Sequence, residues 1–203
     1  MLHDEGYIQF LMNYTQRRVY VPIPQALLQV RDRLHRMGMI GVYPDGVGYG
    51  NVSMRIPGTS QFLITGTRTG QIFPFTQEAV CLVTHADISS NSVNCTGLVP
   101  ASSESMTHAA CYFSRADIEM VIHVHHAGLW QTLMYTLPTT AADITYGTPA
   151  MACAIGELCA SGGPTGLIVA SGHQDGIFVY GTQADLALSE LIRHYATWSA
   201  KRG

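Results

Sequence analysis

Apolar and polar positions along the chain follow two periods, one typical of helices and the other of strands. Leu27, Leu34 and Met37 recur at near-helical spacing within residues 22–38, and Gly38 supplies a C-cap, so this stretch predicts a helix. Three other stretches predict helices from their N-terminal signals. They are residues 100–114 with Ser102 or Ser103 as the N-cap, residues 147–163 with Thr148 as the N-cap and Pro149 in the first turn, and residues 182–198 with Thr182 and Asp185 spaced as in a capping box.

Short apolar runs and alternating runs predict the strands. Residues 51–56 and 61–65 flank "PGTS" and indicate a hairpin, and residues 165–181 indicate a second hairpin. Residues 79–84 form a short apolar run, whereas residues 117–126, "DIEMVIHVHH", alternate. Because strands and helices mix without regular βαβ order, the pattern predicts an α/β or α+β fold around one sheet.

Composition narrows the class of protein. The 203 residues suffice for one well-formed core, and no repeat or linker divides them, so we expect one domain over residues 1–203. Only 12% of the residues are charged against 47% that are hydrophobic, which indicates a homo-oligomer with part of its surface buried between subunits. The net charge of −3 leaves no basic stripe and argues against nucleic acid as a partner.

The same sequence argues against membrane insertion and secretion. No apolar run approaches the roughly 18 residues of a membrane helix, so no membrane partner is expected. The five cysteines form no CxxC pair and suit a reducing compartment better than a disulfide framework. The first residues, "MLHDEGYIQFLMNY", have no basic region of the kind that starts a signal peptide. These features predict a cytoplasmic protein.

Candidate chemistry begins with three histidines in "VIHVHH", residues 121–126. On a strand, His123 and His125 stand on one face about 6–7 Å apart, and His126 points the other way. Zinc accepts neutral imidazoles in a three-ligand set with an open position, so this pair can hold an ion. Histidines near a strand end are as readily satisfied by hydrogen bonds, and the pair alone does not decide between the two interpretations.

A second group of polar residues falls on one helix. Glu104, His108 and Tyr112 occupy positions i, i+4 and i+8 of the predicted helix over 100–114 and form one polar stripe. Burial of this stripe would require partners, whereas a solvated face would explain it equally well. Ser102 and Ser103 precede the helix N-terminus, where they can bind an anion or simply cap the helix.

Further polar residues lie in predicted turns, where a rigid scaffold often presents its ligands. His173 lies in "ASGHQDGIF", at the turn of the second hairpin, and Asn51 follows a glycine in "GYGNVSMR". Arg68 belongs to "ITGTRTG", a loop whose backbone N–H groups can cradle an anion. Ordinary turn structure accounts for each of these residues taken alone.

The order of the segments is more specific than any one of them. "GNVSMR", "LITGTRTG", "SSESMTHAACY", "VIHVHH" and the hairpin with "GHQDGIFVYG" follow one another in a way that resembles the class II aldolase/adducin family. The resemblance covers roughly residues 24–198 and leaves residues 1–23 as an N-terminal extension. It implies a three-layer α/β/α fold, with a central mixed, mainly antiparallel sheet flanked by helices. It also implies a homotetramer with active sites at subunit boundaries.

The resemblance implies roles for individual residues. The expected ligands of Zn²⁺, or of another divalent metal, are His123, His125 and His173, and Glu104 is the expected catalytic acid/base. The residues expected to hold the anionic group of a small-molecule substrate are Asn51, Thr69, Gly70, Ser102 and Ser103. The loop "ITGTRTG" and the turn "HQDG" are each two residues longer than is usual in the family. Arg68 and Tyr146 are therefore candidates for substrate contacts particular to this chain.

The reaction that the resemblance implies is that of a zinc-dependent lyase of the aldolase type. It would cleave a C–C bond next to a carbonyl in a phosphorylated or carboxylated hydroxy-carbonyl compound, and zinc would stabilise the resulting enediolate charge as a Lewis acid. Epimerases, dehydratases and decarboxylases share the scaffold, and adducin-like relatives are non-catalytic assembly modules, so the fold does not settle the function. A zinc hydrolase with Glu104 as the base is a further alternative.

Overall fold

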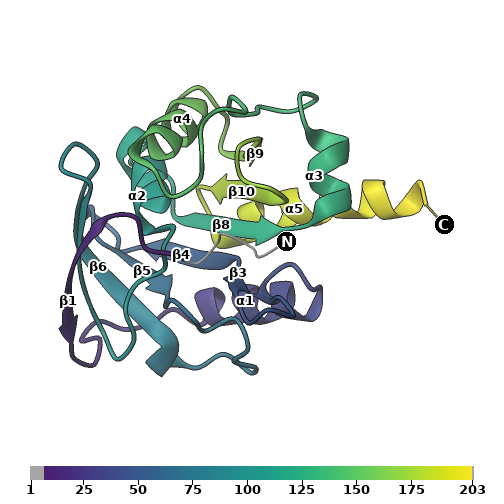
Figure 1. The fold of residues 1–203 in the computed structure, drawn as a ribbon. Coiled ribbons are helices and arrows are strands. Elements are labelled where there is room, and N and C mark those ends of the chain that lie inside the picture. The colour runs from purple at the N-terminus through teal and green to yellow at the C-terminus, as the bar shows by residue number, and fades with distance from the viewer. Residues whose placement is uncertain (1–6, 203) are drawn as a thin grey trace.

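The computed structural model describes residues 7–202, and an eight-stranded sheet lies at its centre (Figure 1). The strands of this sheet are β1 (Leu11–Gln16), β4 (Asn51–Arg55), β5 (Phe62–Thr65), β6 (Val80–Asp87), β7 (Ser92–Gly97), β8 (Met120–His125), β9 (Thr165–Val169) and β10 (Gly176–Gly181). Their order is β1-β7-β6-β5-β4-β8-β10-β9, with β1 and β7 parallel and every other pair antiparallel. The prediction of a mixed, mainly antiparallel sheet is confirmed.

Helices cover both faces of the sheet and complete three layers. They are α1 (Gln25–Arg36), α2 (Ser105–Ser114), α3 (Ala127–Leu133), α4 (Pro149–Ala160) and α5 (Ala184–Ala200), with a 3₁₀ turn, η1, at Gln77–Ala79. One hydrophobic core lies between the sheet and α1, α3 and α5, and a second lies between the sheet and α2 and α4 (Figure 1). None of the helices within residues 7–202 combines the length and apolar character needed to cross a bilayer.

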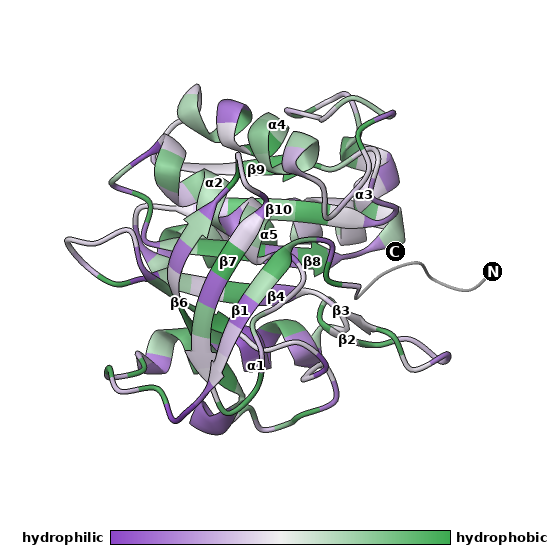
Figure 2. Ribbon diagram, turned by 60° about the vertical axis from the view of Figure 1, so that its left-hand side comes forward, coloured by the Kyte–Doolittle hydropathy of each residue, from purple (hydrophilic) through white to green (hydrophobic). Residues whose placement is uncertain are grey.

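The central strands are buried on both faces, and their side chains divide between the two cores. On β8, Met120, Ile122 and Val124 enter the core under α1, α3 and α5, whereas Val121 enters the other core. Figure 2 shows β8 and β10 as largely hydrophobic strands between the helices. Because side chains alternate along a strand, the polar side chains of β8 share the face covered by α2 and α4. This alternation decides where the candidate site lies.

Local signals located most elements correctly but misplaced two helix caps. Helix α4 begins as predicted, because the Thr148 side chain accepts a hydrogen bond from the Met151 N–H at 3.2 Å. Helix α2 begins at Ser105 with Glu104 in the N-cap position and no side-chain cap, so the prediction of Ser102 or Ser103 was wrong. Helix α5 has Gln183 in the N-cap position, again without a side-chain cap. The capping box of Thr182 and Asp185 was therefore also wrong.

Some elements gave no clear signal in the sequence. They are β1, β7, α3 and a small hairpin formed by β2 (Gly41–Val42) and β3 (Gly48–Tyr49). Strand β1 is an edge strand with exposed and half-buried positions only, so it lacks the apolar run that marks a buried strand. Helix α3 has only 7 residues, which is too short for a periodic pattern to emerge.

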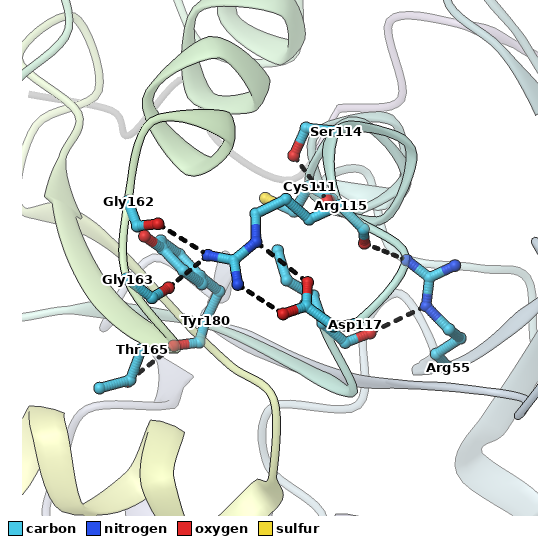
Figure 3. A network of polar contacts seen from close by, with 10 residues as sticks. Arg55, Cys111, Ser114, Arg115, Asp117, Gly162, Gly163, Thr165 and Tyr180 are labelled. Atoms are coloured by element: carbon cyan, nitrogen blue, oxygen red, sulfur yellow. Dashed lines mark hydrogen bonds and ion pairs between the residues drawn. The ribbon is translucent and has the colours of Figure 1, made fainter.

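The start of β8 is fixed by arginines at the end of the strand away from its histidines (Figure 3). Arg115 donates to the carbonyl oxygens of Gly162 and Gly163 and pairs with the Asp117 carboxylate at 2.6 Å. Arg55 donates to the carbonyl oxygen of Arg115 at 2.8 Å. These contacts join the turn before β8 to β4 and to the turn before β9.

Candidate metal centre and active site

Two histidines lie on the last residues of β8, in the middle of the sheet. His123 and His125 are 1% and 4% exposed, and antiparallel pairing to β4 and β10 fixes the backbone at His123 on both sides. Their Nε2 atoms are 3.0 Å apart. Two nitrogens bound to one tetrahedral zinc at about 2.0–2.1 Å would be about 3.3 Å apart, so this separation suits a shared ion.

The opposite nitrogen of each ring has a partner behind the pair. His123 Nδ1 donates to the carbonyl oxygen of Ile177 at 3.2 Å, and His125 Nδ1 lies 3.0 Å from the Tyr43 hydroxyl. A metal-binding histidine nearly always engages its second nitrogen in this way, because the contact fixes the tautomer and the ring orientation. Both rings are therefore oriented with Nε2 toward the centre of the cluster.

The third histidine comes from the turn between β9 and β10. Backbone hydrogen bonds from His173 N to Ala170 O at 3.2 Å and from Gly176 N to His173 O at 2.9 Å shape this turn. The His173 ring centroid lies 4.9 Å from that of His123 and 4.8 Å from that of His125. One ligand atom from each ring lies within 4.8 Å of the others. The convergence expected from the sequence is thus present, and Tyr146 stacks on His173 at 4.7 Å.

Burial keeps His123 uncharged. Desolvation lowers the pKa of His123 well below its ordinary value of 6.5, and the neighbouring His125 and His173 lower it further. A neutral imidazole retains the lone pair that a metal ion needs. Three nitrogen donors of this kind suit zinc, and they leave the ion its full positive charge.

Glu104 is the carboxylate that accompanies the three histidines. It is 3% exposed, and its Oε1 lies 3.9 Å from His173 Nδ1. Its Oε2 accepts a hydrogen bond from the Thr107 hydroxyl at 2.8 Å, which fixes the orientation of the carboxylate. Of the described acidic residues, only Glu104 and Asp45 line the same cavity as the histidines.

The predicted polar stripe on α2 does not act as one unit. His108 and Tyr112 point instead at Ser53 on β4, whose hydroxyl lies 2.7 Å from His108 Nδ1 and 2.6 Å from the Tyr112 hydroxyl. Both side chains are buried and lie outside the cavity that Glu104 lines. They form a structural network, and the solvated face considered from the sequence is excluded.

Burial of His108 makes the stability of the fold depend on pH. Desolvation lowers the pKa of His108 from 6.5 to about 3, so the folded protein excludes a proton that the unfolded chain binds below pH 6.5. Stability is therefore fully present above pH 6.5 and falls as the pH drops toward 3. Urea unfolding at pH 7 and pH 5 is expected to show a loss of about 2 kcal/mol from this residue. Between pH 7 and pH 5, the free energy of unfolding of the His108→Gln variant should fall by about 2 kcal/mol less than that of the wild-type protein. An equal fall in both proteins would show that His108 is not the source of the pH dependence.

The histidines and Glu104 line a cavity of about 470 Å³. All the predicted substrate-binding residues line it, namely Asn51, Arg68, Thr69, Gly70, Ser102 and Ser103, as does Tyr146. The Asn51 Oδ1 atom is buried without a hydrogen-bond partner in the part of the chain that the structure describes. Arg68 is exposed at φ +57°, a backbone conformation that few residues other than glycine adopt.

The hairpin β2–β3 supplies a wall of this cavity that the sequence did not reveal. Residues Val42, Asp45, Gly46, Val47, Gly48 and Tyr49 line it. Tyr43, in the same hairpin, contacts His125 at 3.0 Å, and its ring packs on Tyr49 with centroids 4.4 Å apart. A tyrosine in the turn-like segment "GVYPDGVGYG" carries no signal for a role near a metal.

Tyr43→Phe is expected to weaken metal binding without unfolding the protein. The change removes the hydroxyl that contacts His125 Nδ1 and leaves the aromatic packing in place. Loss of such an outer contact typically lowers metal affinity about 10- to 100-fold. Competition with a chromophoric zinc chelator measures this change, with Tyr20→Phe, an exposed tyrosine that does not line the cavity, as the control. Equal affinities for Tyr43→Phe and the parent would show that Tyr43 has no part in orienting His125.

Comparison with known proteins assigns the fold to a family. The model of the Class II Aldolase and Adducin N-terminal domain matches residues 27–193. The chain belongs to the class II aldolase/adducin family. Its sheet and flanking helices have the mixed α/β fold of that family. A search of curated proteins finds no significant match.

Solved structures of this family superpose over most of the chain at low sequence identity. An L-fuculose 1-phosphate aldolase has a TM-score of 0.62 and 19% identity, covering 88% of this chain and 85% of its own. The L-fuculose-1-phosphate aldolase of Thermus thermophilus has a TM-score of 0.57 and 22% identity, covering 86% of this chain and 87% of its own. YgbL of Klebsiella pneumoniae has a TM-score of 0.64 and 17% identity, covering 87% of this chain and 86% of its own. It is described as a putative aldolase/epimerase/decarboxylase. At these identities the likeness extends to the fold alone.

Proposed function

We propose that this class II aldolase/adducin family member is a zinc-dependent lyase of the aldolase type. The observation that carries the proposal is the convergence of His123, His125 and His173 beside the Glu104 carboxylate. An inert assembly module has no use for three buried imidazoles whose ring nitrogens face one another. The proposed substrate is a small hydroxy-carbonyl compound with a phosphate or carboxylate group.

The donor set fits a zinc ion. His123, His125 and His173 would hold it, and the partners of the first two rings at Ile177 O and Tyr43 would keep their Nε2 atoms directed at it. When bound, zinc supplies Lewis-acid stabilisation of negative charge on the carbonyl and neighbouring oxygens of the substrate. The remaining chemistry falls to the side chains and backbone groups that line the cavity.

Glu104 is the proposed acid/base. Its Oε1, on the side of His173, would take or return the proton that moves when the C–C bond breaks, while Thr107 holds Oε2. A positioned carboxylate of this kind contributes about 10²- to 10⁴-fold to a rate.

The anionic group of the substrate would bind to other residues of the same cavity. Ser102, Ser103 and the loop with Thr69 and Gly70 line the cavity, and the exposed Arg68 adds a positive charge. Binding of the anionic group there would orient the reacting carbonyl, which is the way binding energy from a non-reacting part of the substrate assists a reaction. A homotetramer with sites at subunit boundaries is proposed on the family resemblance alone.

Metal content and product analysis test the proposal together. We expect stoichiometric zinc in the purified protein, and release of an aldehyde when it is offered a panel of ketose phosphates and hydroxy acids. If protein purified after growth in zinc holds no metal, the non-catalytic assembly module would be favoured over the lyase. Conversion of a substrate without change in its carbon count would favour an epimerase or dehydratase at the same site. Carbon dioxide release would favour a decarboxylase.

The bond that the protein cleaves separates a lyase from a hydrolase. A hydroxamate that mimics an enediolate should bind the zinc-loaded protein and compete with substrate, but it would also chelate the zinc of a hydrolase, so its binding reports on the metal alone. A zinc hydrolase that activates water with Glu104 would cleave esters or amides instead of a C–C bond. Ester hydrolysis without retro-aldol activity would overturn the lyase assignment.

A further inference from the structure

One buried arginine lies behind the loop with Thr69 and Gly70, which lines the cavity. Arg31, on α1, is 1% exposed, although α1 is otherwise an amphipathic helix with exposed basic residues. Arg31 is not among the residues that line the cavity. Burial of a guanidinium is costly unless its hydrogen bonds are satisfied, so its partners indicate its purpose.

The partners of Arg31 are the two carbonyl groups of the loop. Its Nη2 donates to the carbonyl oxygen of Thr69 at 3.0 Å and to that of Gly70 at 2.9 Å. Its Nη1 lies 3.4 Å from Asp32 Oδ1, and its guanidinium stacks over the Phe75 ring at 4.5 Å. The same Asp32 oxygen accepts a hydrogen bond from the Phe75 N–H at 2.9 Å. Arg31 and Asp32 thus fix both ends of the segment from residue 69 to residue 75.

The direction of these carbonyls determines the direction of two N–H groups. In a planar trans peptide, the N–H of the next residue points opposite to the C=O. Because the Thr69 and Gly70 carbonyls point at Arg31, the N–H groups of Gly70 and Gln71 point away from Arg31, and both residues line the cavity. No hydrogen bond within residues 7–202 uses either N–H. Successive free N–H groups of this kind form an anion-binding concavity.

The packing of Gly70 fixes the loop from a second direction. A Cβ atom at Gly70 would lie 2.1 Å from the carbonyl oxygen of Gly41, so the loop touches the chain just before the β2–β3 hairpin turns. The Thr69 hydroxyl donates to the carbonyl oxygen of Gly66 at 2.7 Å. The loop is therefore held on one side by Gly41 and on the other by Arg31, and the N–H groups of Gly70 and Gln71 remain available to a ligand.

We infer that Arg31 is a positioning residue for the anionic group of the substrate. Its guanidinium holds the Thr69 and Gly70 peptides in the orientation that presents the Gly70 and Gln71 N–H groups, and its charge adds a positive potential behind them. The inference rests on the proposed function, in which the loop with Thr69 and Gly70 binds a phosphate or carboxylate group of the substrate. Arg31 acts through the loop and does not itself touch the substrate.

A pair of hydroxamates tests this role. Glycolohydroxamate and its phosphorylated form share the part that mimics the enediolate and differ in the phosphate, so the ratio of their Kd values for the zinc-loaded protein isolates phosphate binding. We expect the wild-type protein to prefer the phosphorylated compound. Arg31→Lys keeps the charge but loses the double hydrogen bond, and should reduce that preference about tenfold. Arg31→Met should reduce it further.

Controls distinguish positioning from general damage. Arg33→Met removes an exposed arginine of the same helix and should leave the ratio unchanged. A purely structural role for Arg31 would lower Tm and leave the ratio as it is, and that result in the well-folded Arg31→Lys would overturn the inference. So would a wild-type protein that binds both compounds equally.

A second titration separates this inference from the proposed function. Inorganic phosphate, titrated calorimetrically into metal-free protein, reports on the loop without the histidines. Weaker phosphate binding in Arg31→Lys than in Arg33→Met supports the inference even if neither hydroxamate binds, which would count against the metal centre alone. Equal phosphate binding in the two variants would refute it.

Discussion

His173→Ala is expected to abolish zinc binding at stoichiometric protein concentration and to lower aldol-cleavage activity at least about 10³-fold. Zinc sites with four ligands are worth roughly 10–16 kcal/mol, so one ligand contributes about 3 kcal/mol, or more than about a hundredfold in Kd. His173 lies in a turn rather than in the sheet, so the fold should survive its loss. Zinc content after gel filtration and the rate of aldehyde release measure the two effects.

His126→Asn is the matched control for this experiment. His126 adjoins the β8 pair in sequence but caps α3, where its Nδ1 accepts a hydrogen bond from the Leu129 N–H at 3.1 Å. Asparagine is also a good N-cap, so this variant should fold and keep its zinc. Full zinc occupancy in His173→Ala would remove the third ligand from the proposal, and loss of zinc in His126→Asn would show that the effect is not specific to the cluster.

Glu104→Gln is expected to lower kcat about 10²- to 10⁴-fold while zinc content stays stoichiometric. Glutamine keeps the size of the side chain and an oxygen that can accept from the Thr107 hydroxyl, but it cannot take up the proton of the reaction. KM should change little, because the loss concerns proton transfer rather than substrate binding. Steady-state kinetics with a substrate from the ketose phosphate panel, at constant zinc loading, measures both constants.

Glu157→Gln, an exposed carboxylate on α4, controls for the change in charge. It should leave kcat and KM at their wild-type values. A Glu104→Gln protein with wild-type kcat would exclude the Glu104 carboxylate from proton transfer. A loss of zinc in that variant would mean instead that Glu104 contributes to metal binding.

Local patterns predicted those parts of the fold whose signals are local. The helix over 22–38, the two hairpins and the alternating strand with His123 and His125 appear where they were expected, because turn residues and periodicity act over a few positions. The parallel pairing of β1 with β7 joins residues about 80 positions apart, and no local pattern encodes it. The order of the strands in the sheet was likewise not predicted, because it depends on contacts between residues far apart in the chain.

The candidate site divides in the same way between local and distant signals. The spacing of His123 and His125 marks a shared face, and the family resemblance supplied His173 and Glu104. Arg31 gave no signal, since an arginine on an amphipathic helix normally belongs to the solvent face. For His108 the local signal was wrong. Its spacing from Glu104 predicted one shared polar face, whereas its hydrogen-bond partner is Ser53 on a strand distant in the sequence.

The three histidines lie on backbone segments of unequal rigidity, and this difference determines how a bound ion would be released and rebound. Strand β8 is clamped by a strand on either side and by the arginine contacts at its far end, whereas the third imidazole is carried by a turn of a few residues. Opening that turn leaves the sheet intact, so it is the low-energy route for exchange. Chelator-driven release should therefore have the rate of a local fluctuation rather than of global unfolding, and the β9–β10 turn should exchange its amide protons first.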